Sequence, residues 1–257
     1  MRILPPWTLF HVPHDSTFVP QNIRSQFSLS DAELSDELIK MTDHHTFDLF
    51  AKEVPSNQVI RSQVSRLVMD VERFEDDEQE LMSQRGMGAV YMSTHAGQPL
   101  RHPLTQPERE ILLNNWYRPH HAALNQAVNQ ALIQYGQALV IDAHSFPSLA
   151  LPYELDQNPD RPEICIGTDD FHTPHSLITA MTEAFSGAGF DVRLNSPFAG
   201  ALVPINHYGK DQRVSAVMIE VRRDLYIDES TGVPLPDFDK TAQKIQECVA
   251  NSLGSRR

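Results

Sequence analysis

The chain has 257 residues, of which 40% are hydrophobic and 21% are charged, which is ordinary for a globular protein with one large domain or two small ones. Its 34 acidic and 21 basic residues give a net charge of −13. Because binding to nucleic acid or to an anionic membrane needs basic surface, we expect no nucleic acid and no membrane among the partners.

The cysteines and the N-terminal segment indicate the compartment. Cys165 and Cys248 are far apart and form neither a disulfide framework nor a thiolate metal site. Residues 1–7 lack the apolar core of a signal peptide, and no apolar run approaches the ~20 residues of a membrane span. We therefore expect a soluble, unprocessed, cytoplasmic protein, while the sequence leaves the oligomeric state open.

The first predicted strand, over 8–12, ends in a loop that carries two histidines, His11 and His14. Pro13 excludes a regular helix between them, but a loop can still aim both rings at one ion. The loop repeats an arrangement found again at His144, which favours His14 as a metal ligand over a structural histidine. His11 is expected to support the site or to contact substrate.

A capping box from Ser30 to Glu33 and apolar residues at helical spacing predict a helix over 31–41. Thr42 and Asp43 then indicate the cap of a second helix, with Phe47, Phe50 and Ala51 as its apolar face. A carboxylate at a helix start is pre-positioned and complements the helix dipole, so Asp43 is a candidate ligand, with a plain N-cap as the alternative.

Residues 64–71 alternate well enough to predict a strand with Arg66 and Asp70 on one face. Arg73 follows, and its guanidinium can form a bidentate clamp on a carboxylate. A structural ion pair between Asp70 and Arg73 is the competing interpretation. An acidic run and several glycines then predict a long irregular excursion, of the kind that often forms lids, to about residue 104.

A second capping box, Thr105 to Glu108, predicts a helix through Trp116 that Pro119 breaks or kinks before a further helical segment. The buried run 138–141 predicts a central parallel strand that ends in a loop.

Asp142 and His144 follow that run two residues apart and face the same side if the strand continues. An imidazole there can bind a metal while the carboxylate orients it. In the alternative, Asp142 caps the loop and His144 bonds only to backbone.

Strands are predicted at 164–167, 191–194 and 214–221, and helices from 173 and 237. Glu220 lies inside the last apolar run, where an acid is costly unless it is paired or functional, and we favour function. Arg222 is expected on the face of Glu220 and Arg223 on the opposite face. Asn195 and His207 lie in turn-rich loops that can contact substrate.

The candidate groups fall at the ends of strands in one α/β domain over 1–257, without an internal repeat or an interdomain linker. Two imidazoles, a carboxylate and an open fourth position describe a catalytic zinc site, and a further acid can act as general base. Serine hydrolases, phosphate-binding loops and dinucleotide folds are disfavoured because their glycine-rich fingerprints do not occur.

Six ordered sequence blocks resemble the N-formylglutamate amidohydrolase family, which belongs with zinc carboxypeptidase-like and cell-wall-amidase-like hydrolases. The blocks are His-Val-Pro-His-Asp-Ser-Thr from 11, Met-Thr-Asp from 41, Ser-Arg-Leu-Val-Met-Asp-Val-Glu-Arg-Phe from 65, Asp-Ala-His-Ser-Phe-Pro-Ser from 142, Ile-Gly-Thr-Asp from 166, and Ile-Glu-Val-Arg-Arg-Asp-Leu-Tyr from 219. Typical members carry Pro-His-Ser-Gly or Pro-His-Ala-Gly where this chain has Pro-His-Asp-Ser.

The resemblance implies a three-layer α/β/α fold with a mixed, mostly parallel central sheet. It also implies zinc-dependent hydrolysis of a small anionic N-formyl or related N-acyl amino acid. For N-formyl-L-glutamate the products are formate and L-glutamate, a late step of histidine degradation.

By position, His14 and His144 resemble the two histidine ligands and Glu220 the catalytic acid. Related hydrolases place the other ligand where this chain has Thr17 or Asp43. We choose Asp43, with His45 and His11 as further alternatives.

The resemblance also requires arginines for the oxyanion and for the substrate carboxylates. We assign Arg66 and Arg222 to the oxyanion, and Arg73 and Arg223 to the substrate, although sequence alone does not separate these roles. Further substrate contacts are expected from His11, Asn195 and His207. A non-catalytic dicarboxylate binder, a related zinc peptidase or amidase, and a structural subunit are the competing functions.

Overall fold

The structure is a computed structural model that describes residues 4–254. Its helices are α1 (Asp31–Met41), α2 (Thr46–Phe50), α3 (Gln106–Leu112), α4 (Arg118–Tyr135), α5 (His175–Gly187) and α6 (Phe238–Gly254), with short 3₁₀ turns between some of them. Its strands are β1 (Thr8–Val12), β2 (Val59–Arg61), β3 (Ala138–Phe146), β4 (Ile164–Gly167), β5 (Val192–Leu194), β6 (Val214–Arg222), β7 (Ile227–Asp228) and β8 (Val233–Pro234).

Six strands form the central sheet, in the order β2-β1-β3-β6-β4-β5. Neighbouring strands are parallel except at one place, where β4 runs antiparallel to β6. The two longest strands, β3 and β6, lie side by side at the centre, and every residue of β3 is buried. The predicted mixed, mostly parallel sheet is therefore confirmed.

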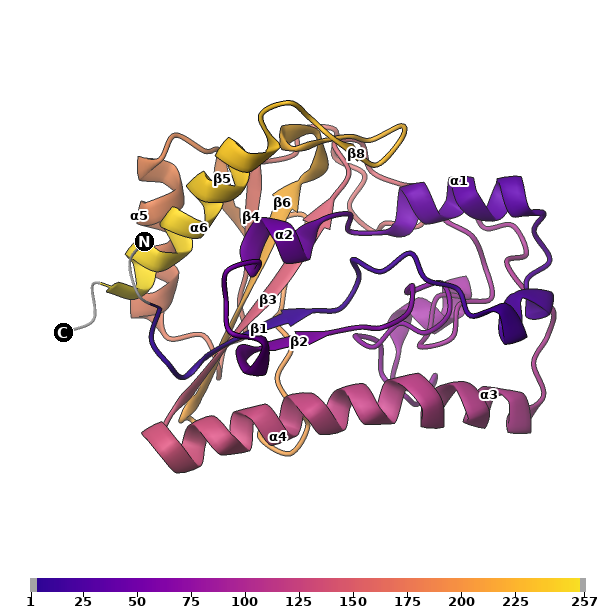
Figure 1. Ribbon diagram of the computed structural model, residues 1–257, viewed down its shortest axis with the longest axis horizontal. Helices are drawn as coiled ribbons and strands as arrows, with labels where there is room; N and C mark the ends of the chain where they lie inside the picture. Colours follow the sequence, from indigo (N-terminus) through magenta and orange to yellow (C-terminus); the bar gives the residue numbers. More distant parts are fainter. Residues whose placement is uncertain (1–3, 255–257) are drawn as a thin grey trace.

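Helices cover both faces of the sheet. Apolar side chains of α2, α5 and α6 pack on one face, and those of α4 pack on the other. Figure 1 shows this division, with α3 and α4 as one long rod on the far side of the strands from α6. A separate apolar cluster lies under α1 and the irregular segments beyond the sheet. The three-layer α/β/α fold is confirmed.

The local helix signals were accurate. Ser30 and Glu33 form the predicted capping box at α1, and Thr105 and Glu108 form the one at α3. Pro119 does not end the helix, however. A π-helical turn, Leu113–Tyr117, precedes it, and α4 continues through the proline. A local change of helix pitch thus accommodates the ring and the missing N–H.

The predicted strand over residues 64–71 is wrong. The segment is irregular, and all eight of its side chains are buried, so it has no solvent face to produce true alternation. Its backbone bonds locally and to loops, with Ser65 N–H donating to Phe18 O and Asp70 N–H donating to Ala89 O. Buried Arg101 adds bonds from its guanidinium to the carbonyls of Leu67 and Val68.

The predicted cap at Thr42-Asp43 is also wrong. Helix α2 begins at Thr46, and its N-cap is His45, which adopts a left-handed conformation with φ of 62°. This turn leaves the Asp43 side chain free to face the interior, where it serves the site described below.

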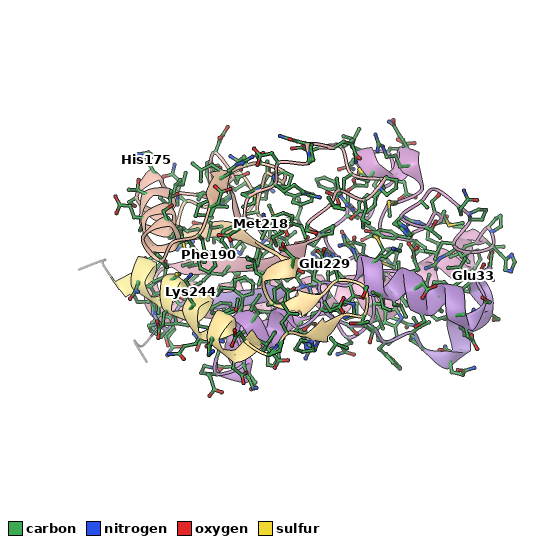
Figure 2. The ribbon with its side chains drawn as sticks, turned by 90° about the horizontal axis from the view of Figure 1, so that it is seen from above. Glu33, His175, Phe190, Met218, Glu229 and Lys244 are labelled. Carbon is green, nitrogen blue, oxygen red and sulfur yellow. The ribbon has the colours of Figure 1, made fainter. Side chains whose placement is uncertain are left out.

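The helices on the α6 face pack through both apolar and cationic contacts. Figure 2 labels Lys244 of α6 and Phe190, which follows α5; the Lys244 amino group lies 3.9 Å from the centre of the Phe190 ring. None of the described helices is long and apolar enough to span a membrane.

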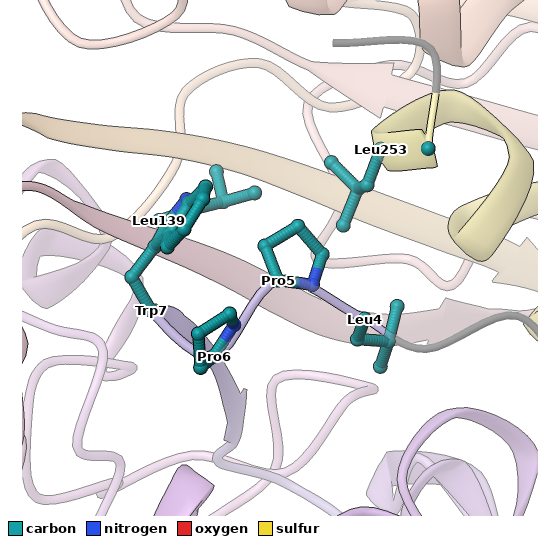
Figure 3. A pocket seen from close by; sticks show the side chains of 7 residues that line it. Leu4, Pro5, Pro6, Trp7, Leu139 and Leu253 are labelled. Carbon is teal, nitrogen blue, oxygen red and sulfur yellow. The ribbon is translucent and has the colours of Figure 1, made fainter. Parts of the chain in front are cut away.

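An apolar hollow of about 290 Å³ lies at the amino ends of β1 and β3 (Figure 3). Its lining consists of Leu4, Pro5, Pro6, Trp7, Leu139, Leu253 and Gly254. Because this lining carries no acid, base or nucleophile, the chemistry must be sought at the opposite, carboxyl ends of the strands.

Candidate active site

Polar side chains converge at the carboxyl ends of β1, β3 and β6. His144 on β3 is in register with Glu220 on β6, so both side chains leave the sheet on the same side. Asp142 lies two residues before His144, and its side chain contacts the His144 ring as the sequence predicted. All three residues are at least 90% buried, which places charged groups in a region of low dielectric constant.

Two imidazoles face one carboxylate oxygen in this region. Asp43 Oδ2 lies 3.7 Å from His14 Nδ1 and 3.2 Å from His144 Nδ1. The other oxygen of Asp43 accepts a hydrogen bond from Arg223 at 2.8 Å, and the backbone N–H of Ser145 donates to Oδ2. The Asp43 carboxylate is therefore fixed between the two rings.

The outer nitrogen of each imidazole is held by a second carboxylate. His14 Nε2 lies 2.8 Å from Asp70 Oδ1, and His144 Nε2 lies 3.1 Å from Asp142 Oδ1. An imidazole whose one nitrogen is held by a carboxylate presents the other nitrogen in a defined direction, as in many metal sites.

Asp70 is itself anchored on several sides. Tyr91 donates its hydroxyl to Asp70 Oδ2 at 2.5 Å, Arg66 donates to the same oxygen at 2.9 Å, and the backbone N–H of Glu72 donates to Oδ1. Burial opposes the charge of Asp70, but His14 and Arg66 hold the pKa of this carboxyl well below its ordinary value. Asp70 therefore stays ionised and keeps its bond to His14.

Glu72 was not among the residues predicted from the sequence. Its Oε2 lies 3.1 Å from His144 Nε2 and 3.9 Å from His14 Nδ1, and its Oε1 lies 3.5 Å from His11 Nδ1. In the described part of the chain, two groups of three residues place possible metal-ligand atoms within 4.8 Å of one another. One group is His14, Glu72 and His144, and the other is His11, Glu72 and Asp142. Asp43 belongs to neither group, so Glu72 is a second candidate for the carboxylate ligand.

Glu220 is buried with one carboxylate oxygen unpaired in the described part of the chain. Its Oε2 has no hydrogen-bond partner among residues 4–254. Burial is the largest influence and raises the pKa of Glu220 to about 8, with Asp43 and Glu72 acting in the same direction and His144 and Arg223 opposing it. A carboxyl group in this state can both hold and release a proton near neutral pH.

Three arginines reach the site in different states. Arg223 bonds Asp43 and the backbone oxygens of Lys40 and Ser145, so its guanidinium is fully engaged. Arg66 bonds Asp70 and Tyr91, while its Nη1 is 3.8 Å from Asp43. The Arg73 side chain donates no hydrogen bond to any described residue, and its nearest acids are 3.7 Å away.

Several predicted contacts lie elsewhere. Arg222 bonds Asp224 and the backbone of Arg161, because β6 ends there and the next turn brings Arg223 to the site instead. Asn195 bonds Thr168, and His207 bonds Asn129, so neither is held toward the site.

The alternatives for the carboxylate ligand also separate. Thr17 is exposed, and His45 bonds the carbonyl of Gly232. His11 is fully buried, and its two ring nitrogens bond Asp142 and His120.

The donor set fits a divalent cation. His14 Nδ1 is buried without a partner in the described chain, although it points toward Asp43 and Glu72. The site also contains more acids than arginines, with Asp43, Asp70, Glu72, Asp142 and Glu220 against Arg66, Arg73 and Arg223. Nitrogen and carboxylate ligands with surplus negative charge are typical of zinc sites.

Comparison with known proteins shows which family the chain belongs to. Residues 7–227 match the family model described as N-formylglutamate amidohydrolase. The chain belongs to this family.

Curated relatives of the family include two bacterial enzymes named N-formylglutamate deformylase. The chain is 26% identical to the one from Pseudomonas putida over 230 residues, and 28% identical to the one from Pseudomonas aeruginosa over 232 residues. Each alignment covers 86% of this chain and 82% of the relative.

Two solved structures share the fold. The crystal structure of an N-formylglutamate amidohydrolase from Ralstonia eutropha matches 99% of this chain and 95% of its own, with a TM-score of 0.83 and 22% identity. A gene product of Agrobacterium tumefaciens matches 98% of this chain and 92% of its own, with a TM-score of 0.72 and 22% identity.

Proposed function

We propose that this protein is a zinc-dependent amidohydrolase that cleaves an N-formyl amino acid, with N-formyl-L-glutamate as the first substrate to test. The names of its relatives support the substrate, because two of them are called N-formylglutamate deformylase. The zinc ligands in this proposal are His14, Asp43 and His144.

The unpartnered Nδ1 of buried His14 is the observation that carries the proposal. A buried imidazole nitrogen without a partner is costly unless a ligand satisfies it. Asp43 Oδ2 lies near Nδ1 of both histidines, and both Nε2 atoms are held by other carboxylates. Glu72 is the second choice for the carboxylate ligand, because its closest approach is to His144 Nε2, the nitrogen that already faces Asp142.

Bound zinc supplies Lewis acidity toward the formyl carbonyl and makes water acidic enough to attack it near neutral pH. Glu220 removes a proton from the attacking water as the new C–O bond forms. It returns that proton to the amine nitrogen as the C–N bond breaks, which releases formate and the free amino acid. Burial raises the pKa of Glu220 to about 8 in the metal-free site, and a nearby cation lowers it toward neutrality, which suits both steps.

The arginines divide the remaining work. Arg66 is held by Asp70 and Tyr91 with its Nη1 directed toward Asp43, and this nitrogen stabilises the negative charge on the former carbonyl oxygen. The guanidinium of Arg73 donates no hydrogen bond to any described residue and binds the substrate carboxylate. Arg223 holds Asp43 in place.

The ligand assignment is tested by metal content and affinity. We expect about one zinc per chain in the wild type and loss of zinc in His144→Ala. Asp43→Asn should weaken zinc binding much more than Glu72→Gln. The opposite order would make Glu72 the ligand, and full zinc occupancy in His144→Ala would contradict the site itself.

The role of Glu220 is tested by Glu220→Gln, which removes the basic carboxylate and keeps its shape. The variant should retain zinc and lose at least ~10²-fold in kcat, the low end of general acid–base catalysis. Loss of zinc together with activity would mean that Glu220 is a ligand. Normal kcat with normal zinc would exclude Glu220 from the reaction.

A further inference from the structure

A chain of buried hydrogen bonds connects His144 with helix α4. Asp142 Oδ1 lies 3.1 Å from His144 Nε2 and 2.7 Å from His11 Nδ1, and His11 Nε2 lies 2.8 Å from His120 Nε2. The exposed fractions are 3% for His144, 2% for Asp142, 0% for His11 and 8% for His120. The side chains of His144, Asp142 and His11 leave the sheet on the face that α4 covers, so the chain runs through the protein interior from the candidate metal site to that helix.

The order of donors along this chain follows from Asp142. A carboxylate only accepts, so His11 must carry a proton on Nδ1 and His144 a proton on Nε2. The second oxygen of Asp142 accepts the backbone N–H of Leu202 at 2.9 Å. The other ring nitrogen of His144, Nδ1, faces the site beside the His14 ring and lies 3.2 Å from Asp43 Oδ2, where a bound zinc ion would replace any proton on it.

His120 completes the chain at the far end. The two Nε2 atoms of His11 and His120 are 2.8 Å apart, and a hydrogen bond between them requires a proton on one of the two. Burial, assisted by the nearby His11 and His121, holds the pKa of His120 well below its ordinary value, so its ring stays neutral. If His120 could not bond His11, the buried Nε2 of His11 would have no partner, and the ring could flip away from Asp142.

We propose that His120 is a positioning residue for the zinc site, acting through His11 and Asp142 to hold the Nδ1 atom of His144 toward the ion. This inference rests on the proposed zinc site. In this role the His120 side chain, which belongs to α4, touches neither substrate nor metal. Partners in the outer shell of a metal typically change its affinity by about 10–100-fold, and for a residue two links away we expect about 10-fold.

The experiment measures zinc affinity by competition with a chromophoric chelator, together with the visible spectrum of the cobalt-substituted protein. His120→Leu removes the bond and should weaken zinc binding about 10-fold and change the cobalt spectrum. His120→Gln keeps an amide that can donate or accept, so it should stay within about 3-fold of the wild type. Leu124→Ala is the control, because Leu124 is fully buried on the same helix and makes only apolar contacts.

The outcomes separate the inference from the proposed function. Equal zinc affinity in His120→Leu and the wild type would overturn the inference, and so would an equal loss in Leu124→Ala, which would point to packing alone. A wild type that binds no zinc would instead overturn the proposed site.

If His120→Leu does not fold, a measurement on the wild type tests the inference instead. Nitrogen-15 NMR of the imidazoles should show His11 protonated at Nδ1, with one proton shared by the two Nε2 atoms. Protons on both Nε2 atoms would contradict the inference.

Discussion

The buried carboxyl of Glu220 should lower the stability of the metal-free protein in alkaline solution. Its pKa rises from the ordinary value of 4.5 to about 8, mainly through burial. Between these values the unfolded chain releases the Glu220 proton while the folded chain keeps it, so stability falls as pH rises through this interval. Glu220→Gln carries no such proton and should escape the loss.

The magnitude follows from the same interval. A tenfold change in proton affinity is worth about 1.4 kcal/mol, so 4.5 to about 8 gives an upper limit of roughly 5 kcal/mol. The glutamine amide would lack a partner, as Glu220 Oε2 does within residues 4–254, which costs about 1–3 kcal/mol. The variant should thus be less stable than the wild type by about 1–3 kcal/mol near pH 4.5 and more stable by roughly 2–4 kcal/mol near pH 8.

Urea unfolding in the presence of a chelator, at about pH 4.5 and about pH 8, measures this difference. The two stability curves should cross between these values. Saturating zinc is the control, because a nearby cation favours the ionised carboxylate and should reduce the advantage of the variant. A variant that is less stable than the wild type by the same amount at both values would refute the reasoning.

Three further changes test other parts of the site. Arg73→Lys should lower kcat/KM about 10-fold, mainly through KM, because an ammonium cannot form the bidentate fork. The control Arg222→Lys should leave kcat/KM unchanged, and equal effects of the two variants would contradict the assignment. Asp70→Asn should weaken zinc binding about 10–100-fold through the loosened His14, and an unchanged dissociation constant would refute this anchor. Burial lowers the pKa of His121 from 6.5 to about 4, so the wild type should lose stability as pH falls through this range. In urea unfolding near pH 4, His121→Gln should recover up to roughly 3 kcal/mol of this loss. If the stability of the variant and of the wild type fell in parallel with pH, this prediction would be wrong.

The predictions of secondary structure were correct where one short sequence pattern determines the local structure. Strands β3 and β6 are apolar runs at the centre of the sheet, and the two capping boxes fix the starts of α1 and α3. Residues 64–71 failed because burial on all sides mimics the alternation of a strand. The start of α2 failed because the left-handed turn at His45 has no marker such as glycine.

The candidate site could be predicted in part for the same reason. His14, His144 and Glu220 follow or lie in recognisable strands, and the structure brings them to one edge. Glu72 and Tyr91 come from irregular segments, where the path of the chain depends on the tertiary fold. The only sequence signal for Glu72 was its position beside Arg73 at the end of the predicted strand.

Side-chain direction at strand ends was the other limit. Alternation placed Arg222 beside Glu220, but β6 ends at Arg222, and the 3₁₀ turn Arg223–Leu225 brings Arg223 to Asp43 instead. No role was predicted for His120, since nothing in a helix sequence shows that its ring meets His11 of β1.

The most direct test of the proposed chemistry is formate release from N-formyl-L-glutamate by the purified wild type, measured before and after removal of metal. The proposed function predicts stoichiometric formate and glutamate with metal present, no release after chelation, and recovery when zinc is restored. Absence of formate from the zinc-loaded protein, or undiminished release by the metal-free protein, would contradict it.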